Sequence, residues 1–292
     1  MNRRLFIVAN PASGSRNLEK ILRELVDYCT TKQMKYDVFL TAQSQNGWKT
    51  VEDYLDKTYT DLVVVGGDGT INECINGLKY DIPVSIIPNG TGNDFSKTLN
   101  IGSSLKDYMQ TMETGQIKTI DLGVCNERKF VNGVGVGFDG QIVADMLNRK
   151  SIFKGASKYY YYVLRILASY SARKYTFEVN NKSKSKNLIL LCVANGTTFG
   201  GSFKLTPHAD TTDGLLDVCE VGNISGLGRF MNIHRLQSGS HHKLKKVKLY
   251  QTQSLRIAEN PRLEAHIDGE YFEHPPFEFS VLPKALKVRV RS

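Results

Sequence analysis

The stretch that decides the fold of this chain is Leu62-Val63-Val64-Val65-Gly66-Gly67-Asp68-Gly69-Thr70-Ile71-Asn72. Its first four residues form a continuous apolar run, which is typical of a strand buried on both faces of a parallel sheet. The glycines that follow allow a tight turn and let the backbone approach a ligand closely. A helical pattern then begins at Ile71. The stretch therefore predicts the strand, turn and helix of an α/β domain.

Alternating strand and helix signals surround this stretch over residues 1–125. Apolar runs predict further strands at 5–9, 36–40 and 84–87. Apolar residues at helical spacing, such as Leu18, Ile21, Leu22 and Leu25, predict helices at 18–26, 47–57 and 71–78. This order indicates a Rossmann-like, doubly wound α/β domain.

Strand signals dominate from residue 126 onward. Helices are predicted only at 141–148, 157–170 and 227–237. The predicted strands are 130–136, 175–179, 188–193, 215–221, 247–251, 255–258, 263–267, 277–282 and 286–290. This pattern favours a second domain over 126–284 that is a mainly antiparallel β-sandwich.

The positive charge of the chain is concentrated in one segment. The 292 residues carry a formal net charge of +9, with ordinary contents of 41% hydrophobic and 23% charged residues, which exclude disorder and collagen. Residues 149–186 contain ten Lys or Arg and a single acid, Glu178. Four tyrosines at 159–162 lie among Lys154, Lys158 and Arg165, and such a mixture suits the interface of an anionic membrane. The alternative is a core helix with solvated lysines. No nucleic-acid motif accompanies the patch, so we expect no nucleic-acid partner.

Cysteine usage and hydropathy indicate a cytoplasmic protein. The five cysteines are odd in number and none has CxxC spacing, which argues for free thiols in a reducing compartment. The first apolar run, 5–9, is too short for a secretion signal, and no stretch approaches the roughly 18 apolar residues of a membrane span. We therefore expect any membrane contact to be peripheral.

Three turns rich in Gly, Asn and Asp each follow a predicted strand, at 10–15, 66–72 and 88–94. In an open α/β sheet such turns meet at one edge, where ligands bind, and a following helix N-terminus suits phosphate. Asp68 and Asp94 would repel phosphate, so their presence implies a bridging cation, most simply Mg²⁺. Any one of these turns alone is equally a plain loop.

A fourth glycine pattern, Gly135-Val136-Gly137-Phe138-Asp139-Gly140, matches the dinucleotide motif G-x-G-x-x-G. That motif also needs an acidic residue about 20 positions later, and the sequence has none there. The Walker lysine motif is absent as well. The predicted nucleotide site is therefore neither a Rossmann dinucleotide site nor a P-loop.

Five motifs together resemble one known family. They are Asn10-Pro11 with Ser13-Gly14, Gly66-Gly67-Asp68-Gly69-Thr70 with Asn72-Glu73, Gly90-Thr91-Gly92-Asn93-Asp94-Phe95, Asp213-Gly214-Leu215-Leu216, and Asp268-Gly269-Glu270. In this order they cover essentially the whole chain and resemble the diacylglycerol kinase catalytic-domain family, bacterial lipid kinases related to sphingosine kinases and, more distantly, to NAD kinases. The resemblance implies an ATP-binding domain at 1–125, a lipid-substrate β-sandwich at 126–284, an active site between them, and a last strand, about 285–292, that returns to the first domain.

The resemblance also implies roles for individual residues. Asp68 and Asp94 would organise the catalytic Mg²⁺, and Glu270 would be the general base, with Asp268 beside it and Asp68 as a second candidate. A structural Mg²⁺ would use the Asp210 carbonyl, the Asp213 carboxylate and the Leu215 carbonyl. The implied ATP contacts are Asn10, Ser13, Thr41, Gly66, Gly67, Asp68, Gly69, Thr70, Ile71, Asn72, Thr91 and Asn93. Where relatives carry a lysine after the first turn, this chain has Ser15-Arg16. His266 is either a neighbour of the base or a satisfied structural histidine.

The function implied is transfer of the ATP γ-phosphoryl group to a hydroxyl of diacylglycerol or a related lipid, giving phosphatidic acid or its analogue. Such a transfer needs positioning and charge neutralisation, and an alcohol acceptor needs a base. The alternatives are a kinase of a soluble acceptor such as NAD, and a nucleotide-binding regulatory protein with little turnover. A homodimer is a further expectation, since dimers occur in the family. The sequence does not say which lipid is used.

Overall fold

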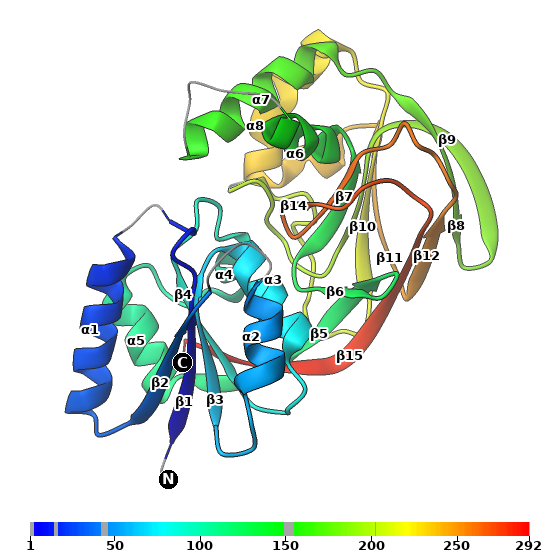
Figure 1. The fold of residues 1–292 in the computed structure, drawn as a ribbon. Coiled ribbons are helices and arrows are strands. Elements are labelled where there is room, and N and C mark those ends of the chain that lie inside the picture. Colours follow the sequence, from blue (N-terminus) through cyan, green and yellow to red (C-terminus); the bar gives the residue numbers. More distant parts are fainter. Residues whose placement is uncertain (1–2, 15–16, 42–45, 149–154, 202, 292) are drawn as a thin grey trace. The chain divides into compact units, whose positions relative to one another are not determined.

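The chain divides into two compact units (Figure 1). The first contains residues 1–120 and 284–292, and the second contains residues 121–283. The computed structural model describes residues 3–14, 17–41, 46–148, 155–201 and 203–291. Arg16 and Lys154, which the sequence analysis singled out, lie outside the described residues, and so do the side chains of Lys158 and Tyr159.

The first unit is a parallel sheet with helices on both faces (Figure 1). Its strands run in the order β2, β1, β3, β4, and Val288 of β15 pairs with Val84 of β4 in parallel. The strands are β1 (Arg4–Ala9), β2 (Lys35–Leu40), β3 (Asp61–Gly66) and β4 (Val84–Pro88). Helices α1 (Leu18–Thr31) and α5 (Leu105–Thr114) contact each other on one face. Helices α2 (Asn46–Tyr54) and α3 (Asp68–Gly77) contact each other on the opposite face, and α4 (Asp94–Leu99) is a short helix after β4. The predicted α/β class is thus confirmed.

Apolar sequence explains why these strands lie at the centre of the sheet. Every residue of β3 and β4 is buried, as the continuous apolar runs predicted. Helix α1 begins after Asn17, whose side chain accepts a hydrogen bond from the Lys20 N–H, and it buries Ile21, Leu25 and Cys29 against the sheet. Burial of side chains of this size contributes roughly 1.5–3 kcal/mol each.

Asp61 at the start of β3 binds Arg3, which precedes β1, and Arg289 of β15. Its carboxylate is 1% exposed and lies 2.6 Å from the Arg3 guanidinium and 2.6 Å from that of Arg289 on β15. Removing the carboxylate would leave two partly buried guanidinium groups without their counter-charge, which is more costly than losing an exposed pair.

We expect Asp61→Ala to lower the free energy of unfolding by about 3–5 kcal/mol, measured by urea denaturation. The matched control is Asp81→Ala, because Asp81 pairs with Lys287 of the same strand but its side chain is 79% exposed. The control should lose less than about 1 kcal/mol. Equal losses in the two variants would contradict the assigned role of Asp61.

The second unit is a mainly antiparallel β-sandwich with three helices packed on it. The path β14-β13-β7-β9-β8-β12-β15 is continuous, and β10 joins β9 to β11. The strands are β5 (Gln116–Cys125), β6 (Arg128–Phe130), β7 (Gly133–Gly137), β8 (Arg173–Val179), β9 (Lys182–Ala194), β10 (Leu216–Gly222), β11 (Val247–Thr252), β12 (Ser254–Ile257), β13 (Ala265–Ile267), β14 (Glu270–Tyr271) and β15 (Phe277–Val290). The helices are α6 (Phe138–Asn148), α7 (Gly155–Ser169), α8 (Gly226–Ser238) and the 3₁₀ turn η1 (Ser240–Lys243). The predicted sandwich is confirmed.

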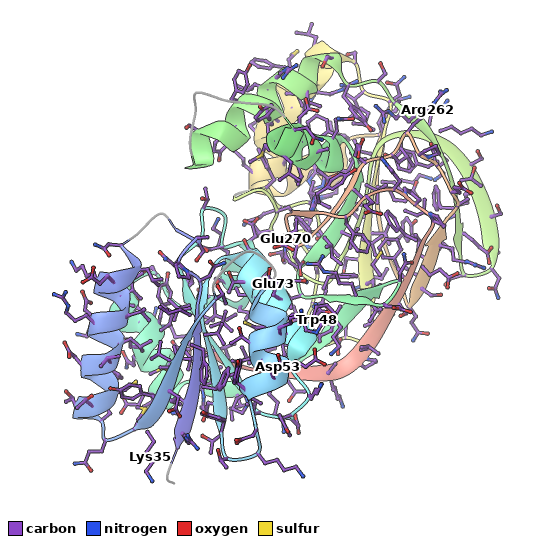
Figure 2. The ribbon with its side chains drawn as sticks, in the orientation of Figure 1. Lys35, Trp48, Asp53, Glu73, Arg262 and Glu270 are labelled. Carbon is purple, nitrogen blue, oxygen red and sulfur yellow. The ribbon has the colours of Figure 1, made fainter. Side chains whose placement is uncertain are left out.

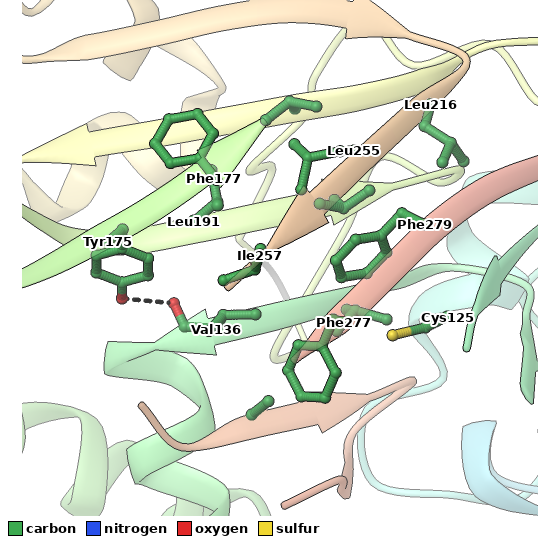
Figure 3. Close-up of a cluster of buried hydrophobic side chains, with 14 of the residues drawn as sticks. Cys125, Val136, Tyr175, Phe177, Leu191, Leu216, Leu255, Ile257, Phe277 and Phe279 are labelled. Atoms are coloured by element: carbon green, nitrogen blue, oxygen red, sulfur yellow. Dashed lines mark hydrogen bonds between the residues drawn. The ribbon is translucent and has the colours of Figure 1, made fainter. Parts of the chain in front are cut away.

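Aromatic and aliphatic side chains fill the sandwich (Figure 3). Phe177, Phe277 and Phe279 are each 2% exposed within one apolar cluster. Tyr175 is fully buried there, and its hydroxyl donates to the Val136 carbonyl at 2.9 Å. The buried phenol therefore has the partner that its polar atom requires.

Two strand predictions were wrong in detail. The predicted strand 130–136 is broken, because the N–H groups of Val131, Asn132 and Gly133 turn away from the ladder to the Asp268 carboxylate. The predicted strands 277–282 and 286–290 form one strand, β15, which bends at Lys284 with φ of +53°. Strand β5 was not predicted, because its first three residues are exposed and two of them, Gln116 and Lys118, are polar.

No helix in the described part of the chain has both the length and the apolar character that crossing a bilayer requires.

Candidate functional site

The glycine turns after β3 and β4 pack against each other backbone to backbone. A side chain at Gly90 would place its Cβ 2.6 Å from the Gly67 Cα, and one at Gly67 would lie 3.1 Å from the Gly90 Cα. The Asn89 N–H donates to the Gly66 carbonyl at 2.8 Å. Only glycine permits this approach, so the glycines predicted to bind a ligand also bring the two turns together.

The turn after β1 is hydrogen-bonded to both of the others. The Asn10 side chain donates to the Thr70 hydroxyl at 3.0 Å, and its carbonyl oxygen accepts the Ala12 N–H at 2.8 Å. The Asn89 side chain donates to the Ser13 carbonyl at 3.2 Å. The three turns predicted from the sequence therefore meet at one edge of the sheet.

The N-terminus of α3 opens onto this edge. The helix begins at Asp68, and Gly67 before it supplies no side-chain cap. The positive end of the helix dipole and the first backbone N–H groups therefore face the turns, which is the arrangement that binds phosphate. The hydroxyl of Thr41, at the end of β2, is buried and finds no hydrogen-bond partner among the described residues. Thr91 is exposed on the third turn.

Asp68 and Asp94 point their carboxylates at one place. A Cβ built on Gly92 would lie 3.2 Å from the Asp68 Oδ2 and 3.4 Å from the Asp94 Oδ2. The Asp68 carboxylate also accepts the N–H groups of Asp94 and Phe95, so it caps α4. Lys97 lies 3.5 Å from the Asp94 carboxylate. Two convergent carboxylates are a donor set that fits Mg²⁺.

Asn93 holds the third turn closed. It adopts φ of +51°, and its side chain exchanges two hydrogen bonds with the backbone of Gly90, at 2.9 and 2.8 Å. The predicted contact of Asn93 with a nucleotide stays a prediction. So do those of Ile71 and Asn72, which are buried in the first turns of α3.

The Asp268-Gly269-Glu270 turn of the second unit is held by its first residue. Asp268 is 5% exposed, adopts φ of +47°, and accepts three backbone N–H groups at 2.8–2.9 Å. Glu270 (Figure 2) begins β14 with a side chain that is 35% exposed. Its carboxylate lies 2.6 Å from the Arg128 guanidinium. The sequence analysis missed Arg128, which a separation of 142 residues hides from any local pattern.

The loop predicted to hold a structural Mg²⁺ is an exposed turn. The Asp213 carboxylate accepts the Leu215 N–H at 3.0 Å and the Gln251 side chain at 2.7 Å, while Asp210 accepts from Thr212. Burial raises the pKa of the neighbouring Asp217, and Asp213 and Asp210 raise it further. Within the described residues no three His, Cys, Asp or Glu side chains gather to hold a metal. A cation there would depend on carbonyls and water, and the site stays a prediction.

Two apolar pockets lie in the second unit, and neither was predicted. One, of about 500 Å³ including its open mouth, contains Asp139 and His266 among otherwise apolar walls such as Ile142, Val163 and Phe203. The other, of about 550 Å³ including its open mouth, is lined mostly by apolar side chains, with Arg229, Asn232 and His241 among them. The pockets share four lining residues, Phe138, Leu167, Leu190 and Leu236. The two pockets therefore lie next to each other.

Comparison with known proteins agrees with this architecture. The family model of the diacylglycerol kinase catalytic domain matches residues 4–125, and that of the YegS C-terminal NAD kinase beta sandwich-like domain matches residues 132–290. A diacylglycerol kinase of Staphylococcus aureus is 28% identical over 296 residues, which cover 99% of this chain and 92% of that protein. Another from Staphylococcus saprophyticus is 26% identical over 293 residues, covering 99% and 95%.

Solved structures show the same fold. A diacylglycerol kinase from Bacillus anthracis matches with a TM-score of 0.74 at 22% identity, covering 99% of this chain and 97% of that one. An NAD kinase from Archaeoglobus fulgidus, in complex with ATP, matches with a TM-score of 0.55 at 11% identity, covering 99% and 93%. The fold is thus the one shared by diacylglycerol kinases and NAD kinases. The chain belongs to the diacylglycerol kinase catalytic-domain family, and it is an enzyme of the lipid kinase type.

Proposed function

We propose that this protein transfers the γ-phosphoryl group of ATP to a hydroxyl of diacylglycerol or a closely related lipid. The observation that carries this proposal is the mainly apolar pocket of the second unit that contains Asp139 and His266. The His266 ring accepts a hydrogen bond from the backbone of the Asp268-Gly269-Glu270 turn. An apolar pocket with a few polar groups at one end suits a molecule with acyl chains and a hydroxyl.

The first unit supplies the nucleotide side of the proposal. The N-terminus of α3 and the glycine backbones of the second turn would bind the phosphates, with Asn10, Ser13, Thr41 and Thr91 adding neutral donors. Asp68 and Asp94 would hold Mg²⁺, which neutralises phosphate charge when bound. Phosphoryl transfer depends mainly on such positioning and charge neutralisation.

Glu270 is the base in this proposal. It is the partly exposed carboxylate of its turn, whereas Asp268 is occupied by three backbone donors. A base must accept the hydroxyl proton as the oxygen attacks phosphorus, and Glu270 has the access to do so. Arg128 holds the Glu270 side chain in place through their 2.6 Å contact. Asp68 remains the second candidate.

The soluble-acceptor alternative keeps one supporting observation, the ATP-bound NAD kinase that shares this fold. The mainly apolar lining of the two pockets favours the lipid. A regulatory role would leave the convergent carboxylates of Asp68 and Asp94 without a use.

Filling the pocket tests this proposal. Leu236 of α8 lines both pockets, and Leu236→Trp would remove room for several methylenes. At about 0.8 kcal/mol per methylene, kcat/KM for a long-chain diacylglycerol should fall roughly 30- to 100-fold, with short-chain acceptor and ATP affected much less. Leu282→Trp is the control, since Leu282 is an exposed residue of β15. An equal loss for short and long chains would argue against an acyl pocket here.

We further propose that α7 and α8 dock on an anionic membrane surface. Helix α8 has no buried residue and exposes Leu227, Phe230 and Met231, while α7 exposes Tyr160 and Leu164. The two helices contact each other (Figure 1). Neither contains an Asp or Glu, and residues 221–258 contain none either. Exposed apolar side chains on two helices that contain no acidic residue suit an anionic lipid surface, which extends the expectation drawn from 149–186.

Phe230→Ser should weaken binding to vesicles of anionic phospholipid by about tenfold or more, because it removes one large side chain from the lipid. Sedimentation with vesicles at two salt concentrations measures this, and the wild-type protein should bind less at high salt. Leu40→Ser is the control, since Leu40 is 57% exposed on β2 of the first unit. If both variants bind like the wild type, the membrane surface lies elsewhere. The homodimer expected from the family stays a prediction.

A further inference from the structure

The glycine pattern at 135–140 has a structural cause that is unrelated to nucleotides. A Cβ on Gly135 would lie 1.8 Å from the Asp139 carboxylate and 2.6 Å from the His266 Nε2. A Cβ on Gly140 would lie 2.2 Å from the Glu264 carbonyl oxygen. Gly135 therefore makes room for a pair formed by Asp139 at the start of α6 and His266 on β13. Gly140 lets α6 approach the segment that leads into that strand.

The Asp139–His266 pair is buried, and each of the two side chains also has a hydrogen bond to the backbone. Asp139 is 8% exposed and His266 is 6% exposed. The His266 Nε2 lies 3.2 Å from the Asp139 Oδ2, and the Asp139 Oδ1 accepts the Gly140 N–H at 2.9 Å. On the other side of the ring, the His266 Nδ1 accepts the Gly269 N–H at 3.3 Å. The ring can serve both partners only as the neutral tautomer with its proton on Nε2.

Through the bond to His266, the Asp139–His266 pair is linked to Gly269, the residue directly before Glu270. Gly269 adopts φ of +87°, and nothing would lie within 4 Å of a Cβ placed on it, so no side-chain packing holds this position. Asp268 anchors the turn on one side through three backbone N–H groups. The bond from the Gly269 N–H to His266 fixes it on the other side.

We propose that Asp139 and His266 are positioning residues for Glu270. Asp139 selects the tautomer of His266, His266 holds the Gly269 N–H, and the fixed peptide sets the direction in which the Glu270 carboxylate leaves the turn. This inference rests on the proposed function only in taking Glu270 as the base. The inference also explains the Gly135–Gly140 pattern, because Gly135 leaves room for the Asp139–His266 pair and Asp139 is one of its two members.

Two substitutions of His266 separate its two hydrogen bonds. In His266→Asn the amide oxygen can take the place of Nδ1 and accept the Gly269 N–H, but the side chain is too short to reach Asp139. In His266→Gln the amide N–H can reach Asp139, but no acceptor remains for Gly269. In Asp139→Asn the new amide donates to Nε2, which moves the ring proton to Nδ1, where it opposes the Gly269 N–H.

The first measurement does not need activity. Long-range proton–nitrogen NMR of histidine-labelled protein should show the His266 proton on Nε2 in the wild-type protein and on Nδ1 in Asp139→Asn. The Gly269 amide should exchange faster with solvent in Asp139→Asn and His266→Gln than in His266→Asn. A proton on Nδ1 in the wild-type protein would overturn the inference even if lipid kinase activity is present. A protein that shows the expected tautomer but phosphorylates no lipid would instead overturn the proposed function.

The second measurement is steady-state kinetics. His266→Gln and Asp139→Asn should lower kcat by about tenfold to a hundredfold, with KM for ATP and lipid within twofold of the wild type, and His266→Asn should lose less. In a Glu270→Gln background, His266→Gln should have little further effect, because the positioned group is already gone. The same loss in both backgrounds would mean a merely structural role. A raised lipid KM with retained kcat would mean that the pair contacts the lipid itself, and either result overturns the inference.

Discussion

Asp68→Ala should abolish phosphoryl transfer, and Asp68→Asn should reduce kcat by at least about a thousandfold. The carboxylates of Asp68 and Asp94 converge beside Gly92, at the edge where the three turns meet. Removing one of two negative charges takes away much of the affinity for a divalent cation, and the cation neutralises charge on the transferring group. Phosphorylated lipid formed from labelled ATP measures the loss.

The asparagine variant separates chemistry from folding. Asp68 also caps α4 by accepting the N–H groups of Asp94 and Phe95, and an asparagine oxygen can keep part of this cap. Asp107→Asn is the matched control, because its carboxylate caps α5 through the N–H groups of Ser103 and Ser104, which lower its pKa to about 2. The control should keep full activity at neutral pH. Normal activity in Asp68→Asn would exclude a charge role for Asp68.

The pKa of Asp107 also defines the pH range in which these variants can be compared. Its folded-state pKa is about 2 and lies below the ordinary value of 3.8, so its contribution to stability is present above about pH 4 and is lost as the pH falls towards 2. Assays near neutral pH therefore keep the cap of α5 intact in the wild-type protein.

Glu270→Gln should lower kcat by about 10² to 10⁴-fold with little change in ATP affinity. Glutamine keeps the size of the side chain and can still accept a hydrogen bond from Arg128, but it cannot take a proton from the acceptor hydroxyl. Steady-state kinetics and ATP binding by calorimetry measure the two effects separately.

Glu264→Gln is the control for the loss of one negative charge. Glu264 lies six residues earlier in the chain, and its carboxylate accepts the Tyr271 hydroxyl at 2.8 Å. This variant should retain most of its activity. If Glu270→Gln keeps near-normal kcat, the base assignment moves to Asp68, whose substitution would then remove both the cation ligand and the base.

The edge of the first unit where the three turns meet could be predicted because its signals are local. Each turn directly follows an apolar run, and each glycine stands where two backbones meet, as Gly67 and Gly90 do. Parallel strands bring their carboxyl ends to one edge, so three sequence-local turns become one site without further information. The convergence of Asp68 and Asp94 follows from the same geometry.

The surroundings of the Asp268-Gly269-Glu270 turn in the second unit could be predicted only in part, because their contacts join distant segments. The ion pair of Glu270 with Arg128 spans 142 residues, and the contact of His266 with Asp139 spans 127. The break in the predicted strand 130–136 has the same origin, since Asp268 draws off its backbone donors. The apolar face of α8 could not be distinguished from a core face, because the helical spacing of apolar residues is the same for both.

The proposed transfer of the phosphoryl group from ATP to a lipid is tested most simply by offering several acceptors to the protein with one phosphoryl donor. The protein is incubated with γ-labelled ATP, Mg²⁺ and micelles that each contain one candidate lipid, with NAD as a parallel soluble acceptor. We expect label in diacylglycerol or a related lipid and none in NAD. With Asp68→Ala we expect no label in either acceptor. Label in NAD alone would contradict the lipid assignment, and ATP binding without label in any acceptor would contradict the kinase itself.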